Sequence, residues 1–290
     1  MATITQIVPA SGVPVQCSGF NQGRESAKVH AIFMEMNLDG QRVVVFGAAR
    51  GIGLAIAHAF TAERCEVVAV DQVHADLHDD SLALQRVVTD VTSYQQVQDV
   101  ADSIGDVSHV VFSVGLGSGK IGFPFWNLDP HDWARVLEVN LLGAVNVAHA
   151  FAPRLAERGH GSLLFLVSVA GQIGSQTDPP YSAAKAALIN FTQCAAKDLA
   201  GYGVRVNALS PGMVRTELNR SVWQASQNGL PASQQKTYDD WANAKIRTVS
   251  PLGQWQTPSE YGAMAVYLAS DHARSITGQT INIDGGQVMH

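Results

Sequence analysis

Tyr181 and Lys185 carry the side chains of this sequence that point most directly to chemistry. They stand four residues apart in PYSAAK and so share one face of a helix. Pro179 and Pro180 come just before, where prolines suit a helix start. A phenol with a pKa of about 10 is a poor base at neutral pH, but a neighbouring ammonium favours the phenolate. The pair predicts a tyrosine that exchanges a proton, although the spacing in isolation is more typical of an ordinary amphipathic helix.

A glycine-rich turn, GAARGIG, joins a run of valines to an alanine-rich stretch at residues 47–53. In a dinucleotide site the first strand-to-helix turn brings backbone N–H groups against a pyrophosphate, and a side chain there blocks the contact. We assign the tight turn to Gly47, close backbone approach to Gly51, and packing of helix on strand to Gly53. The spacing G-x3-G-x-G is one residue longer than G-x-G-x-x-G, so the motif alone is also compatible with a plain turn.

Asp71 ends the second expected strand, EVVAVD, about 20 residues after the glycines. A carboxylate at this place binds ribose hydroxyls and repels a 2′-phosphate, so we predict NAD in preference to NADP. Two alternatives stay open. Asp71 could cap a turn, and Arg50 inside the glycine loop could pair with a phosphate.

Composition narrows the classes of partner. The chain has 290 residues, is 46% hydrophobic and carries a net charge of -6, with no block of Lys or Arg. Neither nucleic acid nor an anionic membrane is favoured, and we expect a small-molecule partner. The three cysteines are far apart and fit neither a disulfide framework nor a thiolate metal site, so we expect no metal. No apolar run reaches the roughly 18 residues of a membrane helix, which predicts a cytoplasmic protein.

After Gly40, β-branched runs alternate with helical patterns, which indicates βαβ units. We predict an α/β fold: a single Rossmann-type, doubly wound domain of about seven parallel strands with helices on both faces. The expected strands are Arg42 to Phe46, Glu66 to Val70, Leu84 to Val88, His109 to Val114, Ser162 to Val167, Val204 to Ala208 and Thr280 to Ile283. Apolar residues recur at helical spacing in 92–104, 131–159, 181–203 and 258–272.

Two segments fall outside this alternation. Residues 1–38 show no clear periodicity, and Met34 and Met36 stand just before the first strand. We predict an N-terminal extension, either poorly ordered or the product of an upstream start, followed by the catalytic domain at 39–290. The stretch from Glu217 to Pro251 is too long for a plain connection, and we predict a substrate lid over about 217–250.

Taken together, the motifs resemble those of the short-chain dehydrogenase/reductase family, over essentially Leu38 to Met289. GAARGIG is similar to the family's cofactor glycines, and Asp90 with Val91 to its pair beside the adenine. EVNLLG supplies Asn140, and Ser168 lies thirteen residues before Tyr181, as in the family. SPGMVRTEL then gives Pro211, Gly212 and Thr216, and ITGQTINIDGG is similar to the last strand.

The resemblance implies a catalytic tetrad of Asn140, Ser168, Tyr181 and Lys185. Ser168 would hydrogen-bond the substrate oxygen and Tyr181 would transfer the proton. Lys185 would lower the pKa of Tyr181 and bind the nicotinamide ribose, Asn140 would hold a water on the proton path, and Thr216 would contact the carboxamide. The implied cofactor contacts are Gly47, Arg50, Gly51, Ile52, Gly53, Asp71, Asp90, Val91, Gly115, Tyr181, Lys185, Pro211, Gly212, Val214 and Thr216.

Two departures from the family pattern concern the cofactor loop. Phe46 stands where the family commonly has Thr or Ser, and FSVGLG replaces Asn-Asn-Ala-Gly, with Gly115 alone retained. Those family residues mainly brace the sheet and the loop, so the departures affect cofactor affinity and local rigidity more than the chemistry.

Candidate substrate contacts are Gln172, Asp178, Trp223 and Trp241, although the two tryptophans could equally pack the lid onto the core. We predict an NAD-dependent oxidoreductase acting on a small secondary alcohol or ketone of polyol, sugar or hydroxy acid type. One alternative is a 3-oxoacyl thioester reductase using NADPH, against which Asp71 argues. Another is a catalytically silent NAD-binding scaffold, whose members usually lose the tyrosine or lysine. The resemblance further implies a homo-oligomer, often a tetramer.

Overall fold

The computed structural model describes residues 35–73, 84–228 and 230–289. One compact unit begins at Met36 and contains every helix and strand of the described residues. Most of the expected extension, residues 1–34, lies outside the described residues. Its last residues do not behave as an extension, because Leu38 is buried and Met36 packs against the core. The folded unit therefore begins slightly before the predicted boundary.

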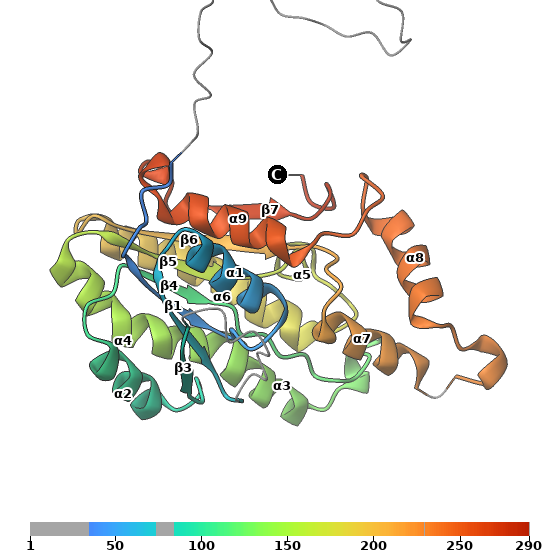
Figure 1. Cartoon of the computed structure of the whole chain (residues 1–290). Coiled ribbons are helices and arrows are strands. Elements are labelled where there is room, and N and C mark those ends of the chain that lie inside the picture. Colours follow the sequence, from blue (N-terminus) through green and yellow to red (C-terminus); the bar gives the residue numbers. More distant parts are fainter. Residues whose placement is uncertain (1–34, 74–83, 229, 290) are drawn as a thin grey trace, which may run out of the picture. The chain divides into compact units, whose positions relative to one another are not determined.

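The strands form one parallel sheet, which confirms the predicted fold class (Figure 1). In the described part of the chain its order is β3-β2-β1-β4-β5-β6-β7. The strands are β1 (Arg42–Phe46), β2 (Glu66–Asp71), β3 (Gln85–Val88), β4 (His109–Phe112), β5 (Gly161–Leu166), β6 (Val204–Pro211) and β7 (Thr280–Ile283).

The strand order reverses at β1, and this reversal locates the site. Phe46 at the end of β1 pairs with Val70 of β2 on one side and with Phe112 of β4 on the other. The chain leaves the neighbouring strands β1 and β4 in opposite directions across the sheet, which opens a crevice beyond their carboxyl ends. The inner strands β1, β2, β4 and β5 are runs of mostly buried apolar residues, as expected of a parallel sheet that is covered on both faces, whereas β3 at the edge is largely exposed.

Helices cover both faces of the sheet, as predicted (Figure 1). The helices α1 (Gly51–Ala62) and α9 (Pro258–Ala269) pack against each other on one face. The other face carries α2 (Tyr94–Ile104), α4 (Gly143–Arg158) and α6 (Pro179–Ala200). Two apolar clusters, one on each side of the sheet, join these layers and fix the strand ends that surround the crevice.

The helical run before β5 is interrupted. It begins as α3 (Pro130–Leu137), widens into a π-helical segment at Glu138–Leu142, and continues as α4. Among the described residues, this run is the one long and apolar enough to cross a membrane by length and composition, but half of its most apolar window is buried. Phe151 and Leu155 lie wholly in the core, which is the behaviour of a core helix.

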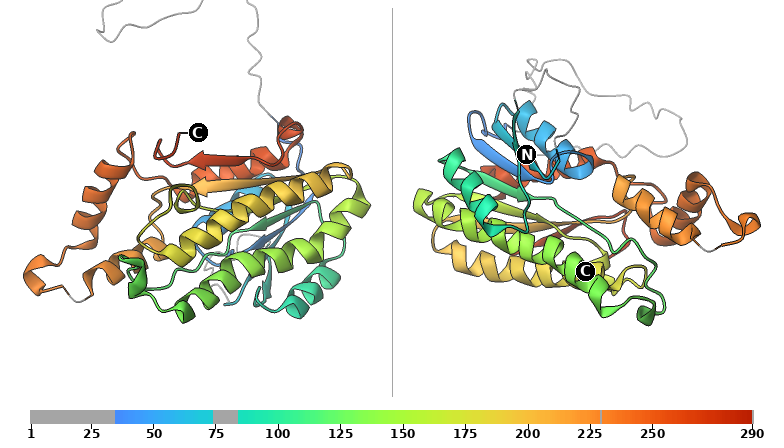
Figure 2. Two further views of the ribbon diagram at one scale, coloured as in Figure 1. Left: turned by 180° about the vertical axis from the view of Figure 1, so that it is seen from behind. Right: turned by 90° about the horizontal axis from the view of Figure 1, so that it is seen from below.

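The expected lid contains two helices, α7 (Glu217–Gln227) and α8 (Tyr238–Val249). Both helices project beyond the carboxyl ends of the strands in each view (Figures 1 and 2). A short helix, α5 (Ala170–Ile173), follows β5, and single 3-10 turns lie at Phe125–Asn127, Ala232–Gln234 and Asp271–Ala273.

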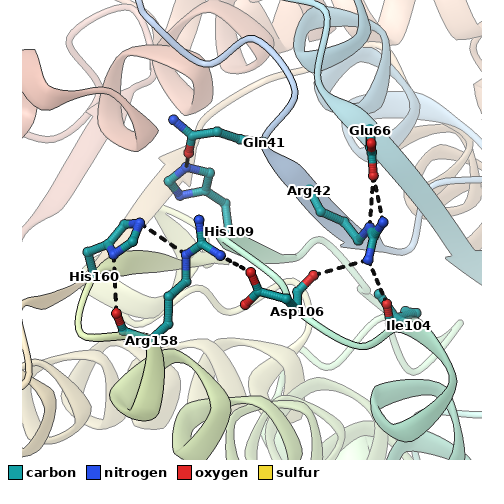
Figure 3. A network of polar contacts seen from close by, with 8 residues as sticks. All are labelled: Gln41, Arg42, Glu66, Ile104, Asp106, His109, Arg158 and His160. Carbon is teal, nitrogen blue, oxygen red and sulfur yellow. Dashed lines mark hydrogen bonds and ion pairs between the residues drawn. The ribbon is translucent and has the colours of Figure 1, made fainter.

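A polar network joins the strands at their amino ends, on the side of the sheet opposite the cleft (Figure 3). His109 opens β4 and is buried; its Nδ1 lies 2.9 Å from Ser162 Oγ and its Nε2 2.7 Å from Gln41 Oε1. Burial lowers the pKa of His109 to about 3, so the ring is neutral at physiological pH. Nearby, Arg42 pairs with Glu66 at 2.7 Å and donates to Ile104 O at 2.8 Å.

Candidate active site

A cleft of about 840 Å³ lies at the carboxyl ends of the strands in the described part of the chain. The glycine loop, the ends of β2, β5 and β6, and the start of α6 all contribute to its walls. Every residue that the resemblance assigned to the cofactor lines this cleft: Gly47, Arg50, Gly51, Ile52, Gly53, Asp71, Asp90, Val91, Gly115, Tyr181, Lys185, Pro211, Gly212, Val214 and Thr216.

The glycine loop has no room for side chains. A Cβ at Gly53 would lie 2.0 Å from Gly47 O, and one at Gly47 would lie 2.8 Å from the Ser113 carbonyl carbon. Gly47 also has a φ of 81°, in the region that favours glycine. The helix α1 starts beside this loop with no side-chain cap from Arg50 and no acidic residue in its first turn. Its free N–H donors and positive dipole end therefore suit the pyrophosphate of a dinucleotide.

Two carboxylates define the far end of the cleft. Asp71 Oδ2 accepts a hydrogen bond from Ala49 N at 3.0 Å, so the end of β2 is joined to the glycine loop. Asp90 Oδ1 accepts from Thr92 N at 2.9 Å and from Thr92 Oγ1 at 2.8 Å, and these bonds lower the pKa of Asp90. The carboxylate of Asp71 is thus held at the end of β2, where a ribose hydroxyl would require an acceptor.

Ser168, Tyr181 and Lys185 come together in the same cleft, from the end of β5 and the first turns of α6. Lys185 Nζ lies 5.6 Å from the centroid of the Tyr181 ring. It donates to Leu166 O at 2.8 Å and to Val114 O at 3.3 Å, which fixes it beneath the tyrosine. Ser168 Oγ accepts from Ala170 N at 3.1 Å and also hydrogen-bonds Tyr181. A phenol, a hydroxyl and an amine therefore converge on one wall.

Asn140 stands behind this wall and does not line the cleft. It is fully buried in the π-helical segment, and its Nδ2 donates to Val136 O at 2.8 Å and to Leu116 O at 2.7 Å. Its Oδ1 accepts from Leu116 N at 3.2 Å. Both amide hydrogens are therefore used by backbone carbonyls, and the expected contact of Asn140 with a water stays a prediction. The side chain joins the widened helix turn to the divergent loop after β4.

The pKa values of the two titrating residues move in opposite senses. Burial raises the pKa of Tyr181 to about 12, with the Ser168 hydrogen bond acting against it. Burial lowers the pKa of Lys185 to about 7. The expected lowering of the tyrosine pKa by Lys185 is not seen in the protein alone, where burial of the phenol is the largest influence on its pKa. A positive charge bound beside the phenol would favour its ionised form.

The expected substrate contacts divide into one that lines the cleft and three that do not. Asp178 lines it, and its Oδ2 accepts from Ser118 N at 2.7 Å. Gln172 points away, because its Nε2 donates to Ser210 Oγ and Asn282 Oδ1, both at 2.6 Å. Trp223 and Trp241 both pack on Tyr238, with ring centroids 5.7 Å and 6.1 Å away, so their role is in the lid.

Other side chains occupy the lid end of the cleft. They come in pairs one helical turn apart, Leu218 with Val222 on α7 and Lys245 with Val249 on α8, and Asn219 and Gln287 join them. The sequence contained a usable signal, since i,i+4 spacing in the predicted lid marks one helix face. We expected the aromatic residues to carry the contacts instead.

Comparison with known proteins agrees with this geometry. Residues 47–288 match the family model described as Enoyl-(Acyl carrier protein) reductase. The chain belongs to the short-chain dehydrogenase/reductase family and is an oxidoreductase that acts on CH–OH groups. Its nicotinamide cofactor is NAD or NADP.

The similar proteins act on different substrates. The chain is 32% identical to the 3-oxoacyl-[acyl-carrier-protein] reductase FabG of Thermotoga maritima, over 88% of this chain and 100% of the relative. It is 30% identical to D-threitol dehydrogenase of Mycolicibacterium smegmatis, over 89% and 97%. A gluconate 5-dehydrogenase from Burkholderia cenocepacia, solved with NADP and tartrate, is 31% identical with a TM-score of 0.74, over 87% and 97%.

Proposed function

We propose that the protein is an NAD-dependent dehydrogenase that exchanges a hydride with a small secondary alcohol or ketone of polyol, sugar or hydroxy acid type. The observation that carries this proposal is the single cleft that holds the glycine loop and Asp71 at one end and Ser168, Tyr181 and Lys185 at the other. The relatives named for threitol and gluconate support the substrate class.

When bound, the dinucleotide supplies the hydride acceptor or donor. The chain itself supplies position and proton transfer. Ser168 donates a hydrogen bond to the substrate oxygen, which holds the reacting carbon in place. In alcohol oxidation, Tyr181 Oη takes the hydroxyl proton as the carbon loses a hydride, and it returns that proton to solvent afterwards; reduction runs in reverse. Lys185, fixed by two carbonyls beneath the ring, stabilises the ionised phenol when it carries its own proton.

Asp71 supports NAD as the partner. Its carboxylate stands on the loop where a 2′-phosphate would bring two further negative charges, and the repulsion disfavours NADP. The second candidate function is 3-oxoacyl thioester reduction with NADPH. It is favoured by the relative from Thermotoga maritima and by Arg50, a cation in the glycine loop that lines the cleft.

One set of rate measurements separates these functions. We expect kcat/KM to be at least tenfold higher with NAD than with NADP, measured at the absorbance of NADH over a panel of polyols, sugars and hydroxy acids. Turnover of acetoacetyl thioesters at least tenfold better with NADPH than with NADH would instead establish the thioester reductase.

The Tyr181→Phe variant tests the catalytic role. Removal of the proton-transferring hydroxyl is expected to lower kcat/KM by about 10²–10⁴. NADH binding, followed by its fluorescence, is expected to change less than threefold, because the ring remains. A fully active Tyr181→Phe protein would refute the mechanism, and wild-type binding of NADH without turnover of any alcohol would favour the scaffold.

A further inference from the structure

The lid end of the cleft contains an unpaired cation. Four cationic residues line the cleft: Arg50, Arg135, Lys185 and Lys245. Arg50 belongs to the glycine loop, Arg135 pairs with Glu138 at 3.0 Å, and Lys185 is fixed by backbone carbonyls. Lys245 remains. In the described part of the chain its ammonium has no hydrogen-bond or ion-pair partner, although it lines the cleft from helix α8 together with Asn219 and Val222 of α7.

The position of Lys245 is fixed by an aromatic platform. Its Nζ lies 4.8 Å from the centroid of the Trp241 ring, one turn earlier on the same helix. Trp241 stacks in turn on Tyr238, with ring centroids 6.1 Å apart, and the Tyr238 hydroxyl donates to Asn219 Oδ1 at 2.9 Å. Contacts from both lid helices thus fix the indole of Trp241, and the indole in turn positions the ammonium of Lys245. A cation–π contact of this kind restricts the ammonium without neutralising it.

The surroundings leave the charge of Lys245 uncompensated. The side chain is half-buried, and burial lowers its pKa. Four acidic residues line the same cleft, and none of them pairs with Lys245 in the described part of the chain. Asp71 and Asp90 lie at the far end; Asp178 accepts from Ser118 N at 2.7 Å through Oδ2, while its buried Oδ1 has no partner; and Glu217 is exposed to solvent in the first turn of α7. A partly desolvated ammonium without a counter-charge is stabilised by an anion brought into the site.

We propose that Lys245 binds a carboxylate of the substrate, so that the enzyme acts on hydroxy acids rather than on neutral polyols or sugars. This rests on the proposed function and narrows its substrate class. The lid then does more than exclude water, because α8 brings the one specificity-determining cation. The amide nitrogen of Asn219, whose Oδ1 accepts from Tyr238, and the side chain of Gln287 line the same cleft and remain for hydroxyls along the carbon chain.

Matched substrates of equal carbon number test this assignment. D-Gluconate and D-glucitol form one pair, and L-threonate and L-threitol a second. We expect wild-type kcat/KM to favour the acid of each active pair at least tenfold. The Lys245→Met variant keeps the aliphatic stem over Trp241 and removes the charge, and it should lose this preference mainly through a higher KM. Rescue by Lys245→Arg is expected to be partial.

Lys236→Met is the matched control. It removes the same charge from the same lid, at a residue that does not line the cleft, and should leave the preference within twofold. Equal loss of acid and polyol turnover in Lys245→Met would overturn the assignment and give Lys245 a structural role. A weaker affinity for NADH in Lys245→Met, with the acid preference unchanged, would make it a phosphate contact and equally overturn it.

A binding measurement separates this inference from the proposed function. Because Lys245 lies against Trp241, gluconate bound to its ammonium is expected to change indole fluorescence in the NADH complex, while glucitol does not. Trp241→Phe removes that signal and assigns it. If no alcohol is turned over, the proposed function fails. The titration still shows whether Lys245 binds a carboxylate. Identical gluconate titrations of wild type and Lys245→Met would refute the inference.

Discussion

Tyr181 and Lys185 share a helix face, yet burial drives both toward their neutral forms. Burial raises the pKa of the phenol to about 12 and lowers that of the amine to about 7. At neutral pH the protein alone therefore holds a protonated phenol beside an amine that is about half protonated. The phenolate that base catalysis requires is favoured when a cation such as an oxidised nicotinamide lies beside the phenol, so proton transfer is coupled to cofactor binding.

This coupling predicts the pH dependence of alcohol oxidation. The reaction needs Tyr181 without its proton, and burial raises the pKa of this phenol to about 12, so kcat/KM should still rise with pH in the alkaline range. Reduction needs the protonated phenol and should fall as pH rises toward this pKa. Lys185→Met removes the ammonium, and we expect at least a tenfold lower kcat/KM with the rise moved to higher pH. A pH-independent wild-type rate of oxidation would contradict this account.

Asp71 predicts the cofactor ratio. Asp71→Asn keeps the size of the side chain and an oxygen to accept from Ala49 N, but removes the charge. We expect the NAD-to-NADP ratio of kcat/KM to fall at least tenfold, mainly through a lower KM for NADP. An unchanged ratio would show that Asp71 only joins β2 to the loop.

At the scale of elements, the contact between β1 and α1 depends on the absence of one side chain. A Cβ at Gly53 would lie 2.0 Å from Gly47 O, so Gly53→Ala must push α1 off the sheet. Overpacking of this kind costs about 1–3 kcal/mol. We expect a lower Tm and weaker NADH binding. Gly201→Ala is the control, since nothing lies within 4 Å of its added Cβ, and it should change stability by about 0.5 kcal/mol at most.

The amino edge of the sheet predicts an acid-sensitive fold. The pKa of His109 is about 3 in the folded protein against an ordinary value of 6.5, so the unfolded chain binds the extra proton between these values. Stability is fully present above pH 6.5 and is lost as pH falls through that window. Between pH 7 and pH 5 this amounts to about 2 kcal/mol. Urea unfolding should show a shallower loss in His109→Gln; equal slopes would contradict the assignment.

Some elements could be predicted from sequence and others could not. The inner strands were predictable because they are short apolar runs buried on both faces, as Val43, Val44 and Val45 of β1 are. The π-helical turn at Glu138–Leu142 was not, because its apolar spacing continues that of the flanking helices. The helices α7 and α8 bury few side chains, so their apolar periodicity was weak. The place of Lys245 in the cleft was not predicted, because the aromatic residues Trp223 and Trp241 were the expected contacts of the lid.

At the scale of the whole molecule, exposed apolar surface favours self-association. Phe125 and Trp126 are 66% and 72% exposed, and they line a groove with Ala183 and Ala186 on the outer face of α6. Apolar patches of this kind mark interaction sites. The same face continues through Asn190 and Cys194, where small side chains allow another helix to approach.

We therefore expect a homo-oligomer, with a tetramer as the form implied by the family. Light scattering after gel filtration at micromolar concentration should give about four times the chain mass of 30.9 kDa. Trp126→Lys places a charge on the patch and should shift the population toward smaller species. A wild-type monomer would refute the prediction. The cytoplasmic location also stays a prediction, which fractionation of cells can check.

The bonds of Gln172 carry a consequence for the end of the chain. Through Ser210 and Asn282, this one amide joins the turn before Tyr181 to β6 and β7, across 110 residues of sequence. Asn282 also donates to Val288 O. Val288 therefore helps to hold β7, and β7 in turn holds the turn that contains Gln172. Purification tags or truncations at the carboxyl terminus are therefore expected to disturb the position of Tyr181. An affinity tag is better placed at the amino terminus.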